Sequence, residues 1–153
     1  MTPPLSPQLI TSRDNSLFKE LRKLASDNTA YRQFGRVWVE GEHLCEAAQK
    51  RGLKADFLVF SEQKWRYALA KYAQVATKTI VLPDRLFNEL TALESPAGMG
   101  CVVKLPQAVL QPHAMAVVLD RVQDAGNVGS IVRSAAAFGF GQVLALKGTA
   151  ALW

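Results

Sequence analysis

The segment from residue 117 to residue 139 constrains the fold more than any other part of this sequence. It begins as an apolar run, continues as a polar loop that contains Gly126 and Gly129, and ends in residues with helical spacing. We predict a strand over 115–122, a helix over 130–138 and a second strand over 142–146. These three elements make a βαβ unit, whose connection should be right-handed and whose strands should pair in a parallel sheet.

The loop of this unit carries polar residues whose spacing is consistent with a ligand site. Asn127, Gly129 and Arg133 form an N-x-G-x-x-x-R pattern. Ligands of open α/β sheets bind beyond the carboxyl ends of the strands, where residues 124–129 should lie. Gly129 has no side chain to stop the Arg133 guanidinium from reaching back over the loop. Together, Asn127, Arg133 and the N–H groups at the start of the helix could bind a phosphate or a developing oxyanion. Taken alone, however, Arg133 is typical of a surface residue and Asn127 of a helix cap.

The residues before this unit alternate between helix and strand patterns. Helices are predicted at 14–24, 42–51, 62–74 and 84–93, and strands at 36–40, 57–60, 79–82 and 100–104. This alternation predicts an α/β layered domain over residues 10–105, with Trp38 and Trp65 in its core.

The prolines suggest where this domain begins and ends. We expect residues 1–9 to be a flexible lead and residues 106–114 to be a linker, because both are rich in proline and lack periodicity. Residues 115–153 then form a second α/β domain, and too few residues remain to complete its sheet.

The charge balance favours a polyanionic partner. Lysine and arginine number 18 against 13 aspartate and glutamate, which gives a formal net charge of +5. The residues that we expect to contact RNA phosphates are Arg13, Lys19, Arg22, Lys23, Arg32 and Arg36. An ordinary solvated helix face is the alternative, because Asp14 and Glu20 offset part of this charge.

The sequence also indicates in which cellular compartment the protein is expected. Its apolar runs are shorter than the roughly 20 residues that a membrane-spanning helix needs, and its N-terminus lacks the pattern of a secretory signal. Cys45 and Cys101 lack the spacing of a metal site, so we expect free thiols in a cytoplasmic protein without a metal.

The run from Leu119 to Gly139 closely resembles the first conserved motif of the SpoU-type RNA 2′-O-ribose methyltransferases, which belong to the knotted SPOUT class. The family's usual proline is Ala125 here. The resemblance extends to 12–24, 39–44 and 95–98, which look like that family's N-terminal substrate-binding domain.

The resemblance implies a fold and a chemistry. The fold would be an L30e-like α/β substrate-binding domain followed by the first βαβ of an α/β-knot methyltransferase domain. Asn127 and Arg133 would belong to the catalytic constellation, and Glu42 would join the basic residues that touch RNA. Because a guanidinium keeps its proton in proteins, Arg133 would orient a phosphate and stabilise the 2′-alkoxide rather than act as a base.

The resemblance also implies partners and a cofactor. The methyl donor would be S-adenosylmethionine, the substrate a structured rRNA or tRNA, and the complete protein a homodimer. The family's second and third motifs, which bind the cofactor, are expected beyond Trp153. We therefore expect the 153 residues to be an incomplete and inactive portion of the enzyme.

Two other functions remain open from the residues. The first is a stand-alone L30e-like RNA-binding module with no catalysis. The second is a nucleotide-binding α/β domain that uses residues 123–129 for phosphate, although the glycine fingerprint G-x-G-x-x-G is missing from that loop.

Overall fold

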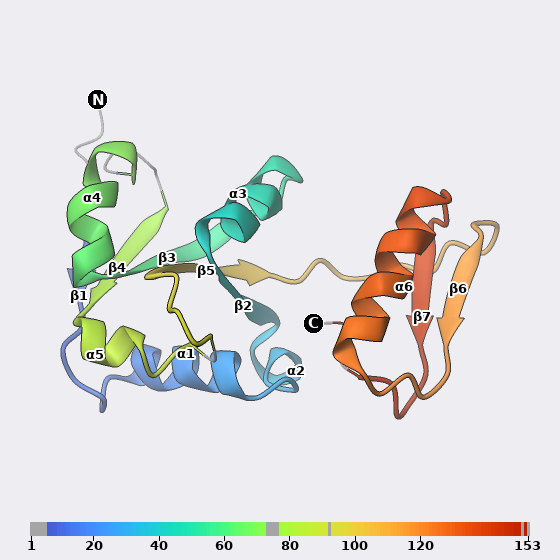
Figure 1. Cartoon of the computed structure of the whole chain (residues 1–153), viewed down its shortest axis with the longest axis horizontal. Helices are drawn as coiled ribbons and strands as arrows, with labels where there is room; N and C mark the ends of the chain where they lie inside the picture. Colours follow the sequence, from blue (N-terminus) through green and yellow to red (C-terminus); the bar gives the residue numbers. More distant parts are fainter. Residues whose placement is uncertain (1–5, 73–76, 92, 151, 153) are drawn as a thin grey trace. The chain divides into compact units, whose positions relative to one another are not determined.

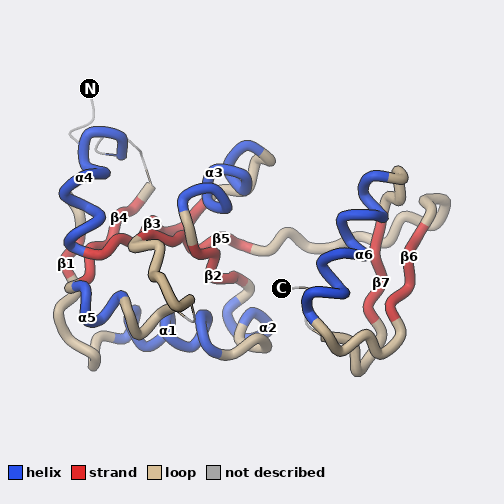
Figure 2. The backbone as a smooth tube through the Cα atoms, viewed as in Figure 1, coloured by secondary structure: helices blue, strands red, loops and turns tan. Residues whose placement is uncertain are grey.

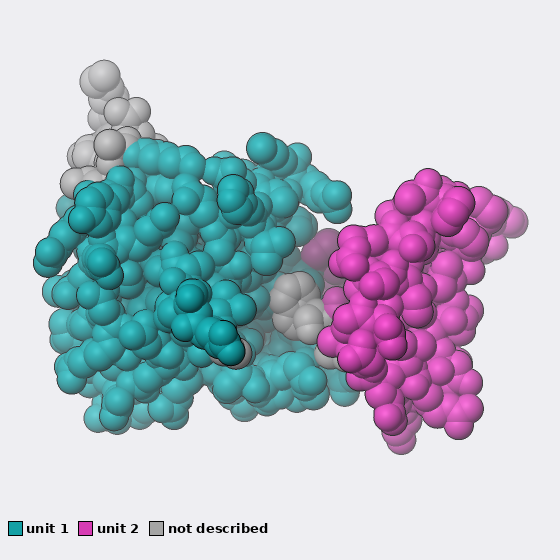
Figure 3. Space-filling view, viewed as in Figure 1, with its two compact units in different colours: residues 1–105 teal, residues 106–153 magenta. Residues whose placement is uncertain are grey.

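The computed structural model describes residues 6–72, 77–91, 93–150 and 152. The chain divides into two compact units, residues 1–105 (unit 1) and residues 106–153 (unit 2), as Figure 3 shows.

Unit 1 is built on a five-stranded mixed sheet with the order β1-β4-β3-β5-β2 (Figure 1). β1, β4 and β3 are parallel to one another, whereas β5 is antiparallel to both of its neighbours, β3 and β2. The strands are β1 (Gln8–Leu9), β2 (Arg36–Glu40), β3 (Ala55–Ser61), β4 (Lys78–Leu82) and β5 (Met99–Lys104).

The helices that the structure describes in unit 1 connect these strands (Figure 2). They are α1 (Ser16–Ser26), α2 (Tyr31–Phe34), α3 (Glu42–Lys50), α4 (Glu62–Tyr72) and α5 (Asp84–Phe87). The side chain of Asn15 caps α1 by accepting hydrogen bonds from the backbone N–H groups of Leu17 and Phe18, at 2.9 and 3.3 Å. The cap satisfies two donors that the first helical turn leaves unpaired.

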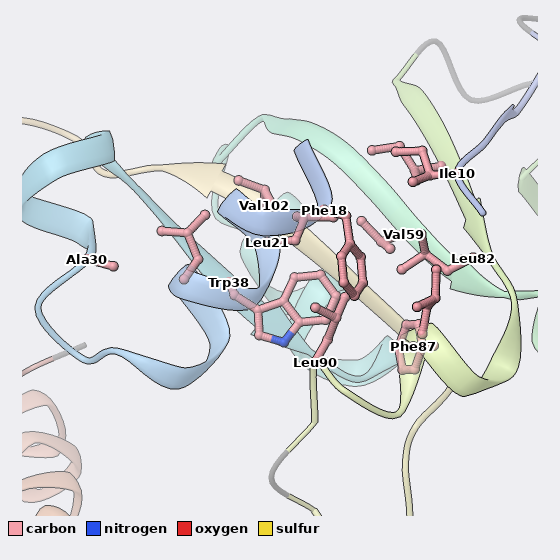
Figure 4. Packing of buried hydrophobic residues seen from close by; sticks show 13 residues of the cluster. Ile10, Phe18, Leu21, Ala30, Trp38, Val59, Leu82, Phe87, Leu90 and Val102 are labelled. Carbon is pink, nitrogen blue, oxygen red and sulfur yellow. The ribbon is translucent and has the colours of Figure 1, made fainter. Parts of the chain in front are cut away.

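The alternation of side chains along the strands creates two cores, one on each face of the sheet. On β3, Val59 belongs to the cluster shown in Figure 4, where it packs with residues of α1 and α5 such as Phe18 and Phe87. Its neighbours Leu58 and Phe60 belong to the opposite cluster, which includes residues of α3 and α4. Unit 1 therefore has helices on both faces of one sheet.

The indole of Trp38 lies directly on the backbone of Gly100. A Cβ atom added at Gly100 would come within 2.2 Å of the Trp38 ring, which leaves no room for any other residue at that position. Trp38 is only 8% exposed and also meets Phe87 edge to face, with ring centroids 6.2 Å apart. Trp38 and the partly buried Trp65 are both core residues, as predicted.

Unit 2 is a βαβ unit made of β6 (Ala116–Leu119), α6 (Ala125–Ala137) and β7 (Gln142–Ala145). β6 and β7 are parallel, as predicted. Val128 and Ala135 are the buried residues of α6, on the side that covers the strands. Among the described residues, none of the helices is long and apolar enough to cross a membrane.

The mixed α/β class is confirmed, but several element boundaries differ from the sequence predictions. β6 ends at Leu119 rather than at residue 122, because Arg121 has a φ of 53° and cannot continue an extended strand. α6 begins five residues earlier than predicted, because Asp124 caps it. α5 ends at Phe87 rather than at residue 93.

The predicted flexible lead, 1–9, also differs in its last residues. Gln8 and Leu9 form β1, whose backbone pairs with Ile80 and Val81 of β4, so main-chain hydrogen bonding orders this short segment without an apolar pattern. Residues 1–5 of that lead and the predicted helical residues 73–74 lie outside the described residues. The short helix α2 was not predicted.

Candidate functional site

The loop between β6 and α6 ends at an acidic cap. The Asp124 carboxylate accepts a hydrogen bond from the backbone N–H of Asn127 at 2.7 Å, and α6 starts at Ala125. Asp124 is therefore the helix cap, and the alternative interpretation of Asn127 as the cap is wrong. Asn127 instead lies in the first turn of α6, where its side chain is exposed. Ala125 occupies the first helical position, which suits the proline that the family has there.

The Arg133 guanidinium folds back along α6 toward its N-terminus. A Cβ atom added at Gly129 would lie 3.5 Å from Nη1 of Arg133, and Nη2 of Arg133 donates to Ser130 Oγ at 3.2 Å. Ser130 Oγ in turn donates to the carbonyl of Gly126 at 2.9 Å. The absence of a side chain at Gly129 therefore opens the space that Arg133 uses, as the spacing predicted.

A second loop closes around the carboxyl ends of β6 and β7. The hydroxyl of Thr149 donates to the carbonyl of Leu119 at 3.0 Å, and the backbone N–H of Ala150 donates to the carbonyl of Val122 at 2.8 Å. Between these two contacts, Arg121 holds its left-handed backbone conformation and its side chain lies against Gly148. These residues were missed in the sequence because they belong to no periodic pattern.

The arrangement in unit 2 can bind an anion and stabilise negative charge. Asn127 lies in the first turn of α6, near the positive end of the helix dipole, and the Arg133 guanidinium reaches back toward that end from the third turn. The described residues do not enclose a cofactor there, because the hollow of unit 2 is a shallow apolar one lined by residues such as Val117, Ile131 and Phe138. These residues alone do not form a site for S-adenosylmethionine.

Most of the predicted RNA-contacting residues lie on or beside α1, away from its buried stripe. Arg13 donates to Glu89 at 2.7 Å and Arg22 lies 3.9 Å from the same carboxylate, while Lys19 lies 3.2 Å from Asp14. The three basic side chains of these ion pairs are each more than half exposed: Arg13 by 70%, Lys19 by 55% and Arg22 by 53%.

The other two basic residues of that region also have local partners. Lys23 donates to Gln33 at 2.6 Å, and Arg32 stacks on the neighbouring Tyr31 ring at 5.7 Å. Weak, exposed contacts of this kind contribute little to stability, so the side chains remain available to a phosphate backbone.

Arg36 differs from these residues because it lies in a partly buried ion-pair cluster. Its guanidinium contacts Glu20 at 2.5 Å and Asp56 at 3.3 Å, and the three side chains are only 22%, 17% and 22% exposed. The cation is already matched by two carboxylates, which favours a structural role for Arg36.

Glu42, at the first turn of α3, is held by three groups of α4. It contacts Lys71 at 2.7 Å and Lys64 at 3.3 Å, and it accepts a hydrogen bond from Tyr72 at 3.1 Å. The hydrogen bond from Lys71, followed by those from Lys64 and Tyr72, lowers the pKa of Glu42 to about 2 against the opposing effect of burial. Glu42 thus joins two helices.

The structure brings together two segments that the family resemblance singled out. The backbone N–H of Ala97 donates to the Glu40 carboxylate at 3.4 Å, and the N–H of Gly41 donates to the carbonyl of Met99 at 2.9 Å. The 39–44 and 95–98 segments are therefore neighbours at one edge of the unit 1 sheet, although they lie more than 50 residues apart in the sequence.

Both cysteines are free and buried, in agreement with the prediction. They lie in the same core cluster of unit 1, and a hydrogen bond between their thiols raises the pKa of Cys45 and lowers that of Cys101. In the described part of the chain, no group of three or more potential ligands from histidine, cysteine, aspartate and glutamate could hold a metal ion.

Comparison with known proteins finds a match within unit 2. Residues 114–153 match the model of the SpoU rRNA Methylase family. The chain is 30% identical over 142 residues to the 23S rRNA (guanosine(2553)-2′-O)-methyltransferase RlmP of Bacillus subtilis, covering 92% of this chain and 55% of that protein. It is 28% identical over 141 residues to the 23S rRNA (uridine(2479)-2′-O)-methyltransferase of Streptomyces viridochromogenes, covering 85% and 48%.

Solved structures agree with these relatives. The SpoU methyltransferase AviRb of Streptomyces viridochromogenes, in complex with the cofactor AdoMet, matches with a TM-score of 0.72 at 26% identity, over 89% of this chain and 54% of that one. An rRNA methyltransferase from Sinorhizobium meliloti matches in fold with a TM-score of 0.71, at 23% identity, over 93% and 56%. The chain spans about half the length of the curated relatives in these comparisons.

Proposed function

We propose that this chain belongs to an RNA 2′-O-ribose methyltransferase that acts on rRNA or tRNA. Its resemblance to the SpoU-type methyltransferases is confirmed by the match at residues 114–153. The observation that carries the proposal is the geometry of α6, where Arg133 folds over Gly129 beside Asn127. S-adenosylmethionine would supply the methyl group, as the cofactor-bound relative supports.

Arg133 and Asn127 would act on the substrate ribose. A guanidinium that remains protonated cannot remove the proton of the 2′-hydroxyl, but it can hold the adjacent phosphate and stabilise negative charge as it develops on the 2′-oxygen. The exposed Asn127 amide can orient the same sugar through hydrogen bonds. Ser130 holds Arg133 in place by accepting from Nη2.

Unit 1 would bind the RNA. The exposed cations on and beside α1 would contact phosphates without reading sequence, whereas Arg36 and Glu42 would support the fold through their ion pairs. We also propose that the complete protein is a cytoplasmic homodimer without a metal and that its cofactor site lies mostly beyond Trp153, so that the 153 residues alone are inactive.

Methyl transfer tests this proposal. The protein expressed from its native gene would be incubated with radiolabelled S-adenosylmethionine and with rRNA and tRNA from cells that lack the gene, and the 153-residue chain would be assayed beside it. Methyl groups on ribose 2′-oxygens support the proposal, and methyl groups on bases contradict it.

A stand-alone RNA-binding module is the second candidate. The observation in its favour is that unit 1 has its own two cores and carries the exposed cations. Salt-dependent RNA binding by the chain, with no methyl transfer by the protein expressed from its native gene, would select this function instead.

A further inference from the structure

A polar groove lies in unit 1, between the start of α4, α5 and the loop that precedes β5. Its volume is about 450 Å³, and the residues that matter here are Ser61, Lys64, Tyr67, Asn88, Pro96 and Gly98. This volume falls in the range of small-molecule sites, which is roughly 300–1,000 Å³. We call it the α4–α5 groove.

Tyr67 is the unusual residue of this groove. Its side chain is 83% exposed, whereas every other aromatic residue that the structure describes in unit 1 packs into one of the two core clusters. On the same helix, Trp65 and Tyr72 face the core, so packing does not require an aromatic ring at position 67. An exposed aromatic ring beside a groove is a platform for stacking a nucleobase, which is sequence-tolerant because every base has a π-face.

The wall opposite α4 is held in place by backbone contacts. Ser61 N–H donates to the carbonyl of Gly98 at 2.9 Å, and the Ser61 hydroxyl accepts from the N–H of Lys64 at 3.1 Å. Gly98 has a φ of 68°, and a Cβ atom there would lie 3.0 Å from Cβ of Lys64. The loop therefore fits closely against the first turn of α4, which gives the groove a fixed shape before any ligand binds.

The polar groups of the groove match a base better than a phosphate. The exposed amides of Gln63 and Asn88 each offer donors and an acceptor, as the edge of a nucleobase requires. The cation, Lys64, is already paired with Glu42 at 3.3 Å, and the Asp84 carboxylate adds negative charge as it accepts from Gln63 N–H at 3.0 Å. A bare phosphate would meet this carboxylate.

We propose that the α4–α5 groove binds one unpaired nucleobase of the RNA substrate, which stacks on Tyr67 and is contacted by the amides of Asn88 and Gln63. The inference rests on the proposed RNA function, and it adds a base-binding site to the phosphate-binding cations of α1. It predicts that the substrate offers an unstacked nucleotide, in a loop or bulge, to unit 1.

Binding of a short single-stranded oligouridylate to the 153-residue chain tests the inference, with an oligomer of the same length that lacks all bases as the comparison. Tyr67→Ala should weaken oligouridylate binding by about 5- to 150-fold, the range expected for the loss of one stacked base. Tyr67→Phe should bind as wild type does, because the ring is retained. Both variants should bind the abasic oligomer as wild type does, and Arg66→Ala serves as an exposed neighbour outside the groove.

The alternative outcomes separate this inference from the proposed function. Equal binding of oligouridylate by wild type and Tyr67→Ala, while Arg22→Ala weakens it, would overturn the base site and leave RNA binding by α1 intact. An equal loss in Tyr67→Ala and Tyr67→Phe would also overturn it, since stacking would then not be the cause. Failure of the wild-type chain to bind either oligomer at low salt would contradict both proposals.

A crosslink provides a measurement that does not depend on a variant. Oligouridylate that carries 5-iodouridine would be irradiated in complex with the wild-type chain, and the modified peptide identified by mass spectrometry. A crosslink at Tyr67 supports the inference. Crosslinks confined to other aromatic residues would overturn it.

Discussion

Gly129 and Arg133 are coupled through space, because Nη1 of Arg133 lies 3.5 Å from the position that a Cβ atom at Gly129 would occupy. The distance is an ordinary van der Waals contact, so a methyl group fits there and a longer side chain does not. The glycine thereby sets how far the guanidinium can fold toward the start of α6. This relationship is the local basis of the proposed site.

Two substitutions of Gly129 distinguish the space that the Arg133 guanidinium needs from the effect of residue 129 on helix stability. Gly129→Ala should keep the Arg133 geometry and stabilise the helix by up to about 1 kcal/mol, because alanine is the better helix former. Gly129→Leu should displace the guanidinium and reduce methyl transfer by the protein expressed from its native gene. Thermal unfolding and transfer rates of both variants check this, and full activity in Gly129→Leu would contradict it.

Removal of Arg36 should affect stability more than RNA binding. Arg36→Met leaves the partly buried Glu20 carboxylate without its cation and leaves Asp56 with only the exposed Lys104, 3.7 Å away, which should cost about 1–3 kcal/mol in the free energy of unfolding. Arg22→Ala should cost little stability and instead reduce the salt dependence of RNA binding by about one phosphate contact. Denaturant unfolding measures the stability of both variants, and RNA binding at several salt concentrations measures their phosphate contacts. A loss of RNA binding without a loss of stability in Arg36→Met would indicate that Arg36 contacts the RNA.

The network of Glu42 should make unit 1 sensitive to acid. The pKa of Glu42 is lowered to about 2 in the folded protein, so its contribution is present above the ordinary glutamate value and is lost as the pH falls from about 4.5 toward 2. We expect ionised Glu42 to contribute about 1–2 kcal/mol to the free energy of unfolding of unit 1, a value that is reduced because the side chain is partly exposed to solvent.

Glu42→Gln should therefore lower stability at neutral pH and flatten the decrease between those two pH values. Unfolding free energies of wild type and variant across this range measure the effect. Glu94→Gln, at an exposed loop position, is the control. An unchanged pH profile in Glu42→Gln would contradict the assigned role.

The contact between Trp38 and Gly100 should tolerate no enlargement. Gly100→Ala would place its methyl group within 2.2 Å of the indole, and overpacking of this kind costs about 1–3 kcal/mol or more. A smaller side chain at position 38 should relieve the clash, so Gly100→Ala should be less harmful in a Trp38→Leu background. A double-mutant cycle measures this coupling, and strictly additive losses would show that the two residues are independent.

The sequence predicted the parts of this structure that depend on local periodicity. The buried stripe of Phe18, Leu21 and Leu24 and the parallel pair around α6 follow from spacing alone. It did not predict β1, because two residues that pair through their backbones carry no side-chain pattern. It placed the start of α6 too late, because Asp124 outweighs the low helix propensity of two glycines.

The candidate site was predictable to a similar degree. The closeness of Arg133 to Gly129 follows from helix geometry and was inferred in advance. The matched charges around Arg36 and Glu42 were not, because their partners Asp56 and Lys71 are distant in the sequence. The exposure of Tyr67 likewise required the fold, since an aromatic residue in a helix is usually a core residue.

The most direct test of the account is methyl transfer by Arg133→Ala, made in the protein expressed from its native gene and compared with wild type on the same rRNA. The account predicts ribose 2′-O-methylation by wild type, a loss of about 10²- to 10³-fold in the variant, as expected when a charge-stabilising group is removed, and unchanged RNA binding. Wild-type rates of methyl transfer in Arg133→Ala would contradict the account.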